Sequence, residues 1–191
     1  MQIPSELQHA LQQVSETLRE AGECWLIGGS CGLLLQHVQL DAMPRDIDIY
    51  ADRIHVAKLH DLLLEYAVDE PAISETDQYY SELSHYNVNG YTLELVGGFK
   101  VTSGHSRYEV MVEKLLLSHS TTVSMDQEVL PLMPLMHELV FNVLRERSDR
   151  YEAIAKAIRK NPSAHLPLWK QISDHCSLSV KHIRQIESLL G

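Results

Sequence analysis

The sequence predicts one α/β or α+β domain with a helical C-terminal part. Short apolar runs typical of strands alternate with amphipathic helical patterns over the first part of the chain, and from Leu135 onward the pattern turns helical. With 191 residues, of which 45% are hydrophobic, the chain is long enough to bury one sizeable core. We therefore expect a catalytic-type domain over residues 1–133, with a helical region over residues 134–191 packed on it.

Local turn chemistry predicts the first elements. Residues 4–21 carry apolar side chains at helical spacing, which indicates a helix. Residues 24–27 read as a short buried strand that Gly28 and Gly29 end, and Ser30 can cap the helix that follows.

The middle of the chain reads mainly as strands. Residues 46–50 form an apolar strand with two aspartates, and residues 52–66 an amphipathic helix. Residues 78–96 alternate about an Asn-Gly dipeptide, which predicts a hairpin closed by the Gly-Gly pair at 97–98. Further strands or strand ends are expected within residues 99–104, 107–117 and 127–134.

Composition disfavours several classes of protein. No apolar run approaches the about 20 residues that a membrane span needs, and the N-terminus lacks the pattern of a signal peptide. Three cysteines without CxxC spacing favour a reduced, cytoplasmic chain. The net charge is -10, and most acidic residues lie in the first 100 positions, so binding to a nucleic-acid backbone is disfavoured.

The stretch IGGSCGLLLQHV…MPRDIDIY carries the chemistry. Asp46 and Asp48 are two residues apart on a predicted strand, so both carboxylates point to the same face. Two adjacent carboxylates repel each other unless a cation lies between them, and oxygen ligands of this kind suit Mg²⁺. The Gly-Gly-Ser turn before them lets backbone N–H groups approach an anion closely at a helix start. The Gly-Gly-Ser turn therefore suits a phosphate group, and the strand with Asp46 and Asp48 suits the metal ion that accompanies a phosphate.

Glu94 is the candidate third carboxylate of a two-metal site. It lies between Leu93 and Leu95 on a predicted strand, where an unpaired acidic side chain would be costly to bury. It could ligate metal and accept a proton from an attacking hydroxyl, although an edge strand with solvent on one side explains it equally well. Arg45 could contact phosphate, or could balance the acidic patch through a salt bridge.

These motifs resemble the nucleotidyltransferase fold superfamily. More narrowly, residues 24–50 are similar to the bacterial group that includes the AbiEii-type toxins and the lincosamide and aminoglycoside nucleotidyltransferases, and residues 91–98 match less fully. The resemblance implies an α+β fold with a mixed β-sheet flanked by helices, and a helical C-terminal part. Two features depart from the family pattern: Glu94 stands where Asp is commoner, and the later helix offers arginines but no Lys at the expected place.

The resemblance also implies an activity and a set of site residues. A nucleoside monophosphate would move from an NTP to a hydroxyl of a small molecule, a protein or an RNA end, with Mg²⁺ as cofactor. The turn of Gly28, Gly29 and Ser30 would hold the nucleotide phosphates, with Arg45 nearby. The catalytic and metal-binding residues would be Asp46, Asp48 and Glu94.

Two other functions remain open at this point. The chain could be a non-catalytic nucleotide-binding or interaction module that kept the fold, or a component of a toxin–antitoxin pair. The eleven histidines show no HExxH motif, and His55 and His60 are five residues apart on different helix faces, so surface histidines are expected rather than a zinc site.

Overall fold

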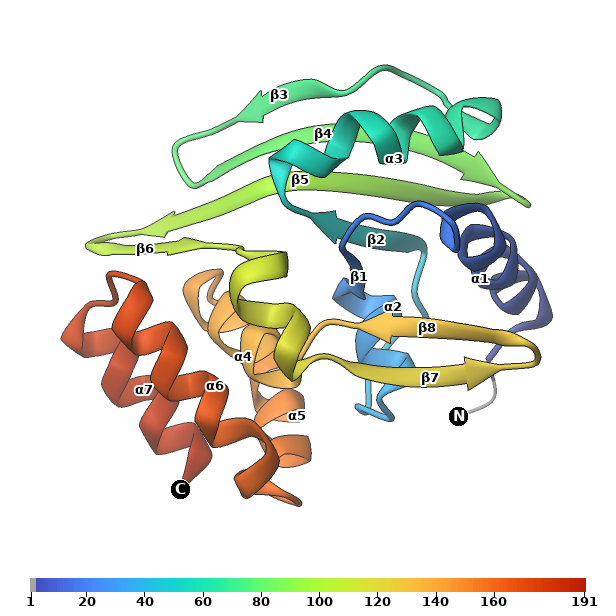
Figure 1. The fold of residues 1–191 in the computed structure, drawn as a ribbon. Helices are drawn as coiled ribbons and strands as arrows, with labels where there is room; N and C mark the ends of the chain where they lie inside the picture. Colours follow the sequence, from blue (N-terminus) through green and yellow to red (C-terminus); the bar gives the residue numbers. More distant parts are fainter. Residues whose placement is uncertain (1–2) are drawn as a thin grey trace.

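The computed structural model describes residues 3–191 and shows one sheet with helices on both of its faces (Figure 1). The strands are β1 Trp25–Gly28, β2 Asp46–Ala51, β3 Ala72–Glu75, β4 Tyr79–Val88, β5 Tyr91–Ser103, β6 Ser106–Glu109, β7 Thr121–Met125 and β8 Glu128–Leu132. The helices are α1 Ser5–Leu18, α2 Gly29–Leu35, α3 Val56–Leu63, α4 Leu135–Leu144, α5 Ser148–Ile158, α6 Pro162–His175 and α7 Val180–Leu190.

The sheet is mixed, with the strand order β3-β4-β5-β2-β1-β8-β7 and with β6 paired to β5 outside this path. Strand β2 is antiparallel to β1 and parallel to β5, so the two strands that carry the predicted carboxylates are direct neighbours. This architecture confirms the predicted α+β class with a mixed sheet, flanking helices and a helical C-terminal part.

Side-chain alternation on β2 sorts the two faces of the sheet. Ile47 and Ile49 are fully buried, and their partners on β5 are the equally buried Leu93 and Leu95. Helix α3 covers this face, since a Cβ built at Gly97, two residues further along β5, would lie 2.1 Å from Val56 Cγ2. The opposite face carries the aspartates and meets α2 and α4.

Three parts of the middle segment differ from the sequence-based expectation. The Gly97-Gly98 pair does not end the hairpin, because β5 continues to Ser103. The apolar residues after Val110 are not a strand: Val112–Leu116 is a π-helical turn, held by the Asp52 carboxylate, which accepts the backbone N–H groups of Val112 and Glu113. Strands β3 and β7 form at the two edges of the sheet without having been predicted.

The C-terminal helices begin directly after the sheet. Strand β8 ends at Leu132 and α4 starts at Leu135, with all ten of its residues buried between the sheet and the helices α5, α6 and α7 (Figure 1). One cluster of buried apolar residues includes members of both parts of the chain. The division of the chain at residue 133 remains a prediction.

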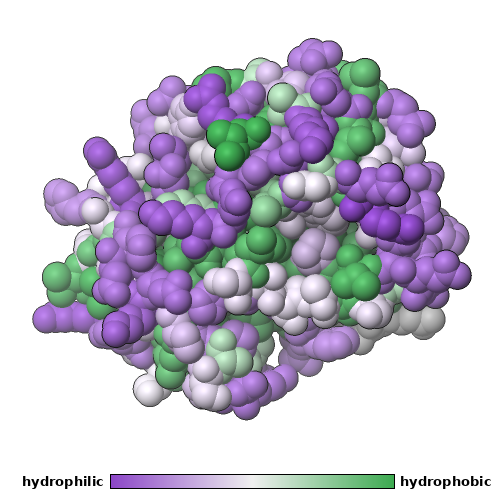
Figure 2. Space-filling model, in the orientation of Figure 1, coloured by the Kyte–Doolittle hydropathy of each residue, from purple (hydrophilic) through white to green (hydrophobic). Residues whose placement is uncertain are grey.

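Several histidines that the sequence suggested to be at the surface are buried. His55, His60, His137 and His182 are buried, so the expectation of surface histidines is wrong for these four. The face shown in Figure 2 is largely hydrophilic, with hydrophobic residues in several separate patches. Within residues 3–191, no helix combines the length and the apolar character that crossing a bilayer requires.

Candidate active site

Three adjacent strands bring the predicted site residues into one row. In the β1–β2 ladder Gly28 pairs with Asp48, and in the β2–β5 ladder Asp48 pairs with Glu94. Directly paired residues project to the same face of a sheet, so the Asp48 and Glu94 side chains are neighbours. Asp46 lies two residues earlier on β2 and shares that face. The register thus places the three carboxylates beside the glycine turn.

The turn between β1 and α2 is shaped for close approach. Gly29 has φ +59°, a left-handed conformation that non-glycine residues adopt with strain, and a Cβ added to it would lie 1.8 Å from Asp48 Oδ2. A Cβ at Gly28 would lie 2.9 Å from Glu138 Oε1. The two glycines therefore let the backbone of the turn pack directly against carboxylates from β2 and α4.

Glu138 of α4 is a fourth carboxylate at this turn. Its Oε1 accepts a hydrogen bond of 2.8 Å from the Gly29 N–H, and its Oε2 lies 3.3 Å from Asn142 Nδ2. The side chain is buried, and burial raises the pKa of Glu138 from an ordinary value of 4.5 to about 7 against the opposing Gly29 hydrogen bond and the positive charge of Arg145. Glu138 therefore fixes the turn from the helical side.

Burial, and then the neighbouring negative charges, disfavour the ionised forms of Asp48 and Glu94. Burial raises the pKa of Asp48 to about 7, and the charges of Asp46 and Glu94 add to this shift. Burial and the charge of Asp46 also raise the pKa of Glu94. Within residues 3–191, the carboxylates of Asp46 and Asp48 accept no hydrogen bond and form no ion pair. Clustered, partly buried carboxylate oxygens, of which those of Asp46 and Asp48 have no protein partner, fit a divalent cation of the Mg²⁺ type.

Positive charge reaches the site from the C-terminal helices. Arg150 on α5 donates a hydrogen bond of 3.0 Å from Nη2 to Ser30 Oγ, at the first turn of α2. Arg145 packs over the Phe141 ring at 4.7 Å and lowers the pKa of both Asp48 and Glu138 against the effect of burial. Arg147 points its guanidinium to Asp149 instead, with two hydrogen bonds of 2.9 and 2.7 Å.

Arg45 lies just before β2, and its side chain is exposed. It makes no hydrogen bond or ion pair with any side chain in the described part of the chain, residues 3–191. The structure thus shows no salt bridge from Arg45 to the acidic patch, and its predicted contact with phosphate remains a prediction.

A histidine, His85, lies next to Glu94 on the strand at the other side of β5 from Asp48. His85 on β4 pairs directly with Glu94 in the β4–β5 ladder, and its Nε2 lies 4.0 Å from Glu94 Oε1. Asp69 holds this histidine from the other side, because its carboxylate accepts hydrogen bonds from the His85 backbone N–H and from Nδ1 at 2.6 and 2.7 Å. The charge of His85 lowers the pKa of Glu94 against the effect of burial.

This geometry can be compared with known proteins. Residues 10–130 match the family model described as aminoglycoside-2″-adenylyltransferase. The chain belongs to this family. Because the matched segment includes β1, α2, β2 and β5, it contains the glycine turn and all three predicted carboxylates. Membership in this adenylyltransferase family, together with the fold, shows that the chain is a nucleotidyltransferase.

Solved structures share the fold of this family member at low sequence identity. The Thermotoga maritima protein TM1012, a candidate nucleotidyltransferase, is 19% identical with a TM-score of 0.63, over 89% of this chain and 96% of that chain. ANT(2″)-Ia in complex with adenylyl-2″-tobramycin is 8% identical with a TM-score of 0.51, over 87% and 99%. The lincosamide adenylyltransferase LnuA, bound to lincomycin, is 12% identical with a TM-score of 0.50, over 78% and 94%. No curated protein sequence matches the chain.

The sequence did not identify three further residues at this adenylyltransferase-family site, Glu138, Arg150 and His85, which come from other elements of the chain. Glu138 carries a readable signal, since it is the only acidic residue in the apolar helix LMHELVFNVL. Arg150 is one of the arginines that the sequence offers in the later helical segment, and nothing in its neighbourhood points to Ser30, 120 residues away. His85 was read as one position of an alternating hairpin, and only the strand register reveals its place beside Glu94.

Proposed function

We propose that this nucleotidyltransferase moves a nucleoside monophosphate from an NTP to a hydroxyl group of a small, antibiotic-like molecule. The row of Gly28, Asp48 and Glu94 across three adjacent strands carries the proposal, because it sets a phosphate-type turn against clustered carboxylates. Neither element alone would be specific, whereas their direct pairing suits the recognition of a metal-bound triphosphate.

The carboxylates fit a Mg²⁺ site of the kind that the fold family implies. Asp46, Asp48 and Glu94 would hold the metal, since they offer clustered oxygen donors. Within residues 3–191, Asp46 and Asp48 form no ion pair, and Glu94 pairs only with His85 Nε2, at 4.0 Å. Bound Mg²⁺ neutralises negative charge on the triphosphate as it reacts. Because the pKa of Asp48 is raised to about 7, both its protonated and its ionised forms are populated at neutral pH, and cation binding would release the proton from the first.

The turn and the two arginines would orient the donor. The turn leads into α2, whose first N–H groups would face the phosphates beyond the Gly29 N–H that Glu138 already accepts. Arg150 already lies within hydrogen-bond distance of Ser30 Oγ. A triphosphate on this turn would meet positive charge from Arg145 and Arg150, whose guanidinium groups suit phosphate oxygens. These contacts would hold the triphosphate beside the acceptor.

Glu94 would accept the proton of the acceptor hydroxyl. Its raised pKa makes it a better base than an ordinary exposed carboxylate, and its side chain is 32% exposed, so an acceptor can reach it. His85, fixed by Asp69, lies on the side of Glu94 away from Asp48 and would help to position its carboxylate. Attack of the hydroxyl oxygen on the α-phosphorus forms the new P–O bond and breaks the bond to pyrophosphate.

The acceptor class rests on relatives and on charge. ANT(2″)-Ia is solved with an adenylylated tobramycin and LnuA with lincomycin, and both share this fold. A net charge of -10 attracts cationic, hydroxyl-rich molecules and repels RNA. The proposal includes a cytoplasmic location, which the three free cysteines support.

Product formation tests the proposal. Purified chain is incubated with Mg²⁺, each of the four NTPs and a panel of aminoglycosides and lincosamides, and mass spectrometry looks for acceptors that gain one nucleoside monophosphate. We expect a product and stoichiometric pyrophosphate with the wild type, and none with Asp48→Asn or Glu94→Gln. Loss of turnover with every acceptor, despite NTP binding, would favour the non-catalytic module instead. Labelling of a protein in a lysate with radioactive NTP, with no small-molecule product, would favour a toxin.

A further inference from the structure

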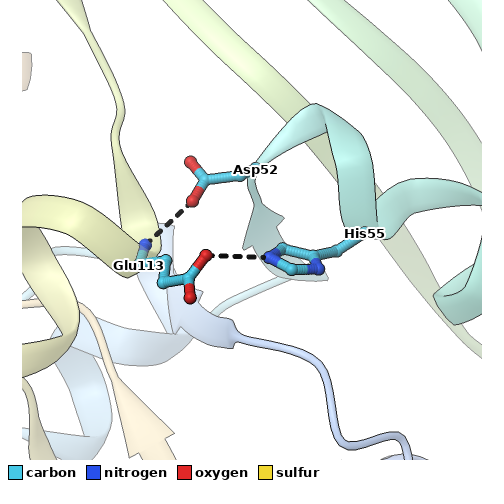
Figure 3. A group of neighbouring side chains, drawn as sticks. All are labelled: Asp52, His55 and Glu113. Carbon is cyan, nitrogen blue, oxygen red and sulfur yellow. Dashed lines mark hydrogen bonds and ion pairs between the residues drawn. The ribbon is translucent and has the colours of Figure 1, made fainter.

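A second cluster of ligand-type side chains lies at the other end of β1 and β2. It consists of Asp52 after β2, His55 in the 3₁₀ turn that follows, and Glu113 in the π-helical turn Val112–Leu116, and we call it the His55 cluster (Figure 3). Asp52 is four residues beyond Asp48 along the chain, about 13 Å at the rise of a strand. The His55 cluster is therefore separate from the catalytic carboxylates.

His55 is prepared for metal binding in this cluster. The residue is 9% exposed, and its Nδ1 hydrogen-bonds the carboxylate of Glu23, which also accepts a bond of 2.8 Å from Lys58 Nζ. A carboxylate only accepts, so Nδ1 donates in this hydrogen bond, and in the neutral imidazole the Nε2 lone pair is then available to a metal. Nε2 is buried and has no hydrogen-bond partner in residues 3–191. A histidine held by a carboxylate behind it is a common arrangement of metal ligands.

The donor atoms are close to the spacing that one ion requires. One ligand atom each from Asp52, His55 and Glu113 lies within 4.8 Å of the other two, and His55 Nε2 is 3.5 Å from Glu113 Oε2. Two donors on one tetrahedral Zn²⁺ are about 3.4 Å apart, given metal–ligand distances of about 2.1 Å. The distance between His55 Nε2 and Glu113 Oε2 already matches this value. Small side-chain rotations would bring the distances to Asp52 into the same range, since the Glu113 side chain is 57% exposed.

We propose that the His55 cluster binds Zn²⁺ through Asp52, His55 Nε2 and Glu113. One imidazole and two carboxylates form a mixed nitrogen and oxygen donor set that suits Zn²⁺ better than Mg²⁺. Asp52 can ligate while its oxygens also accept the N–H groups of Val112 and Glu113, because each oxygen has a second lone pair. The bound ion would fasten the 112–116 turn to the end of β2 and stabilise the fold.

The alternative is a protonated His55 that bridges Glu23 and Glu113 without metal. The local charge disfavours this metal-free arrangement. The three carboxylates of Glu23, Asp52 and Glu113 meet only two groups that can be positive, Lys58 and His55, so negative charge remains in excess. The same three acidic groups act on the neighbouring Cys24, where they add to the effect of burial in raising the thiol pKa. A divalent ion would neutralise this excess of negative charge, which a single protonated histidine would not.

Zinc binding by the full chain tests the site. The chain is freed of metal with a chelator, and Zn²⁺ alone is titrated in competition with a chromogenic chelator, without Mg²⁺ or NTP. We expect one tight Zn²⁺ per wild-type chain and a higher melting temperature with Zn²⁺. Glu113→Gln should weaken binding about tenfold or more and lose the thermal gain, because it removes one ligand from an exposed position that folding does not need.

Two control variants make the outcome decisive. Glu109→Gln changes a glutamate of matching exposure, 54% against 57%, that lies outside the cluster, and it should bind Zn²⁺ like the wild type. Asp48→Asn should keep the tight Zn²⁺, since its carboxylate belongs to the other site. Loss of the ion in Asp48→Asn, equal affinity in Glu113→Gln and wild type, or no binding by the wild type would each overturn the proposal.

Discussion

Gly29 is where the phosphate-type turn and the carboxylate row touch. Its positive φ and its contact with Asp48 Oδ2 are independent demands, since the first concerns the backbone alone and the second concerns a neighbouring side chain. Gly104 makes only the first demand: its φ is +56°, but an added Cβ there would meet nothing within 4 Å. Substitutions at Gly29 and Gly104 therefore distinguish the cost of backbone strain from the effect of displacing the Asp48 carboxylate.

We expect Gly29→Ala to lose activity while Gly104→Ala keeps it. Both substitutions place a side chain in the left-handed region, at a cost of about 1–2 kcal/mol of stability each. Only Gly29→Ala also pushes the Asp48 carboxylate aside, and misplacement by about 1 Å can cost about 10²-fold in rate. Parallel measurement of melting and of initial rates checks this. Equal activity in the two variants would show that Asp48 need not lie against Gly29.

Helix α4 connects the C-terminal part of the chain to the Gly28–Ser30 turn. It is buried on all sides, and its one acidic side chain, Glu138, hydrogen-bonds the Gly29 N–H. The neutral form of this carboxyl is favoured in the folded chain up to a pH of about 7. Between pH 4.5 and 7 the folded state therefore binds more protons here than the unfolded state, so this group lowers stability as the pH rises through that window.

Glu138→Gln should remove that part of the pH dependence. Glutamine keeps a carbonyl oxygen for the Gly29 N–H and cannot ionise, so the variant should be more stable than the wild type by on the order of 1–3 kcal/mol at pH 8. The difference should vanish toward pH 4.5. Thermal melting across this range, with the exposed Glu152→Gln as control, measures it. A constant difference at every pH would mean that Glu138 is not the buried, titrating group.

Elements were predictable where their signals are local. The strand–turn–helix–strand unit over residues 25–51 follows from glycines and apolar runs in sequence, and the structure confirms its order. The expected cap is wrong: α2 begins at Gly29 with Gly28 at its N-cap, so Ser30 lies inside the helix and caps nothing. Residues 112–116 look like part of a strand by their local sequence. The carboxylate that holds them in a turn, that of Asp52, lies 60 residues away, so the local sequence does not reveal it. Strand β5 passes through Gly97, which breaks no strand but admits Val56 of α3 at close range.

The arrangement of the whole chain explains which parts of the site escaped prediction. Asp46, Asp48 and Glu94 were named from strand alternation, a property of each segment alone. Glu138 and Arg150 come from helices more than 100 residues away from the turn they contact, so only the packed molecule reveals them. The site thus joins the sheet, the turn and the C-terminal helices, and residues 134–191 are expected to be needed for activity as well as for stability.

A crystal structure of the chain with Mg²⁺ and a non-hydrolysable NTP tests the central claim most directly. We predict metal between Asp46, Asp48 and Glu94, with the triphosphate on the Gly28–Ser30 turn and within reach of Arg145 and Arg150. Metal bound with the nucleotide but without contact to Asp46 or Asp48, or a triphosphate seated away from the glycine turn, would contradict the assignment of this row as the catalytic site.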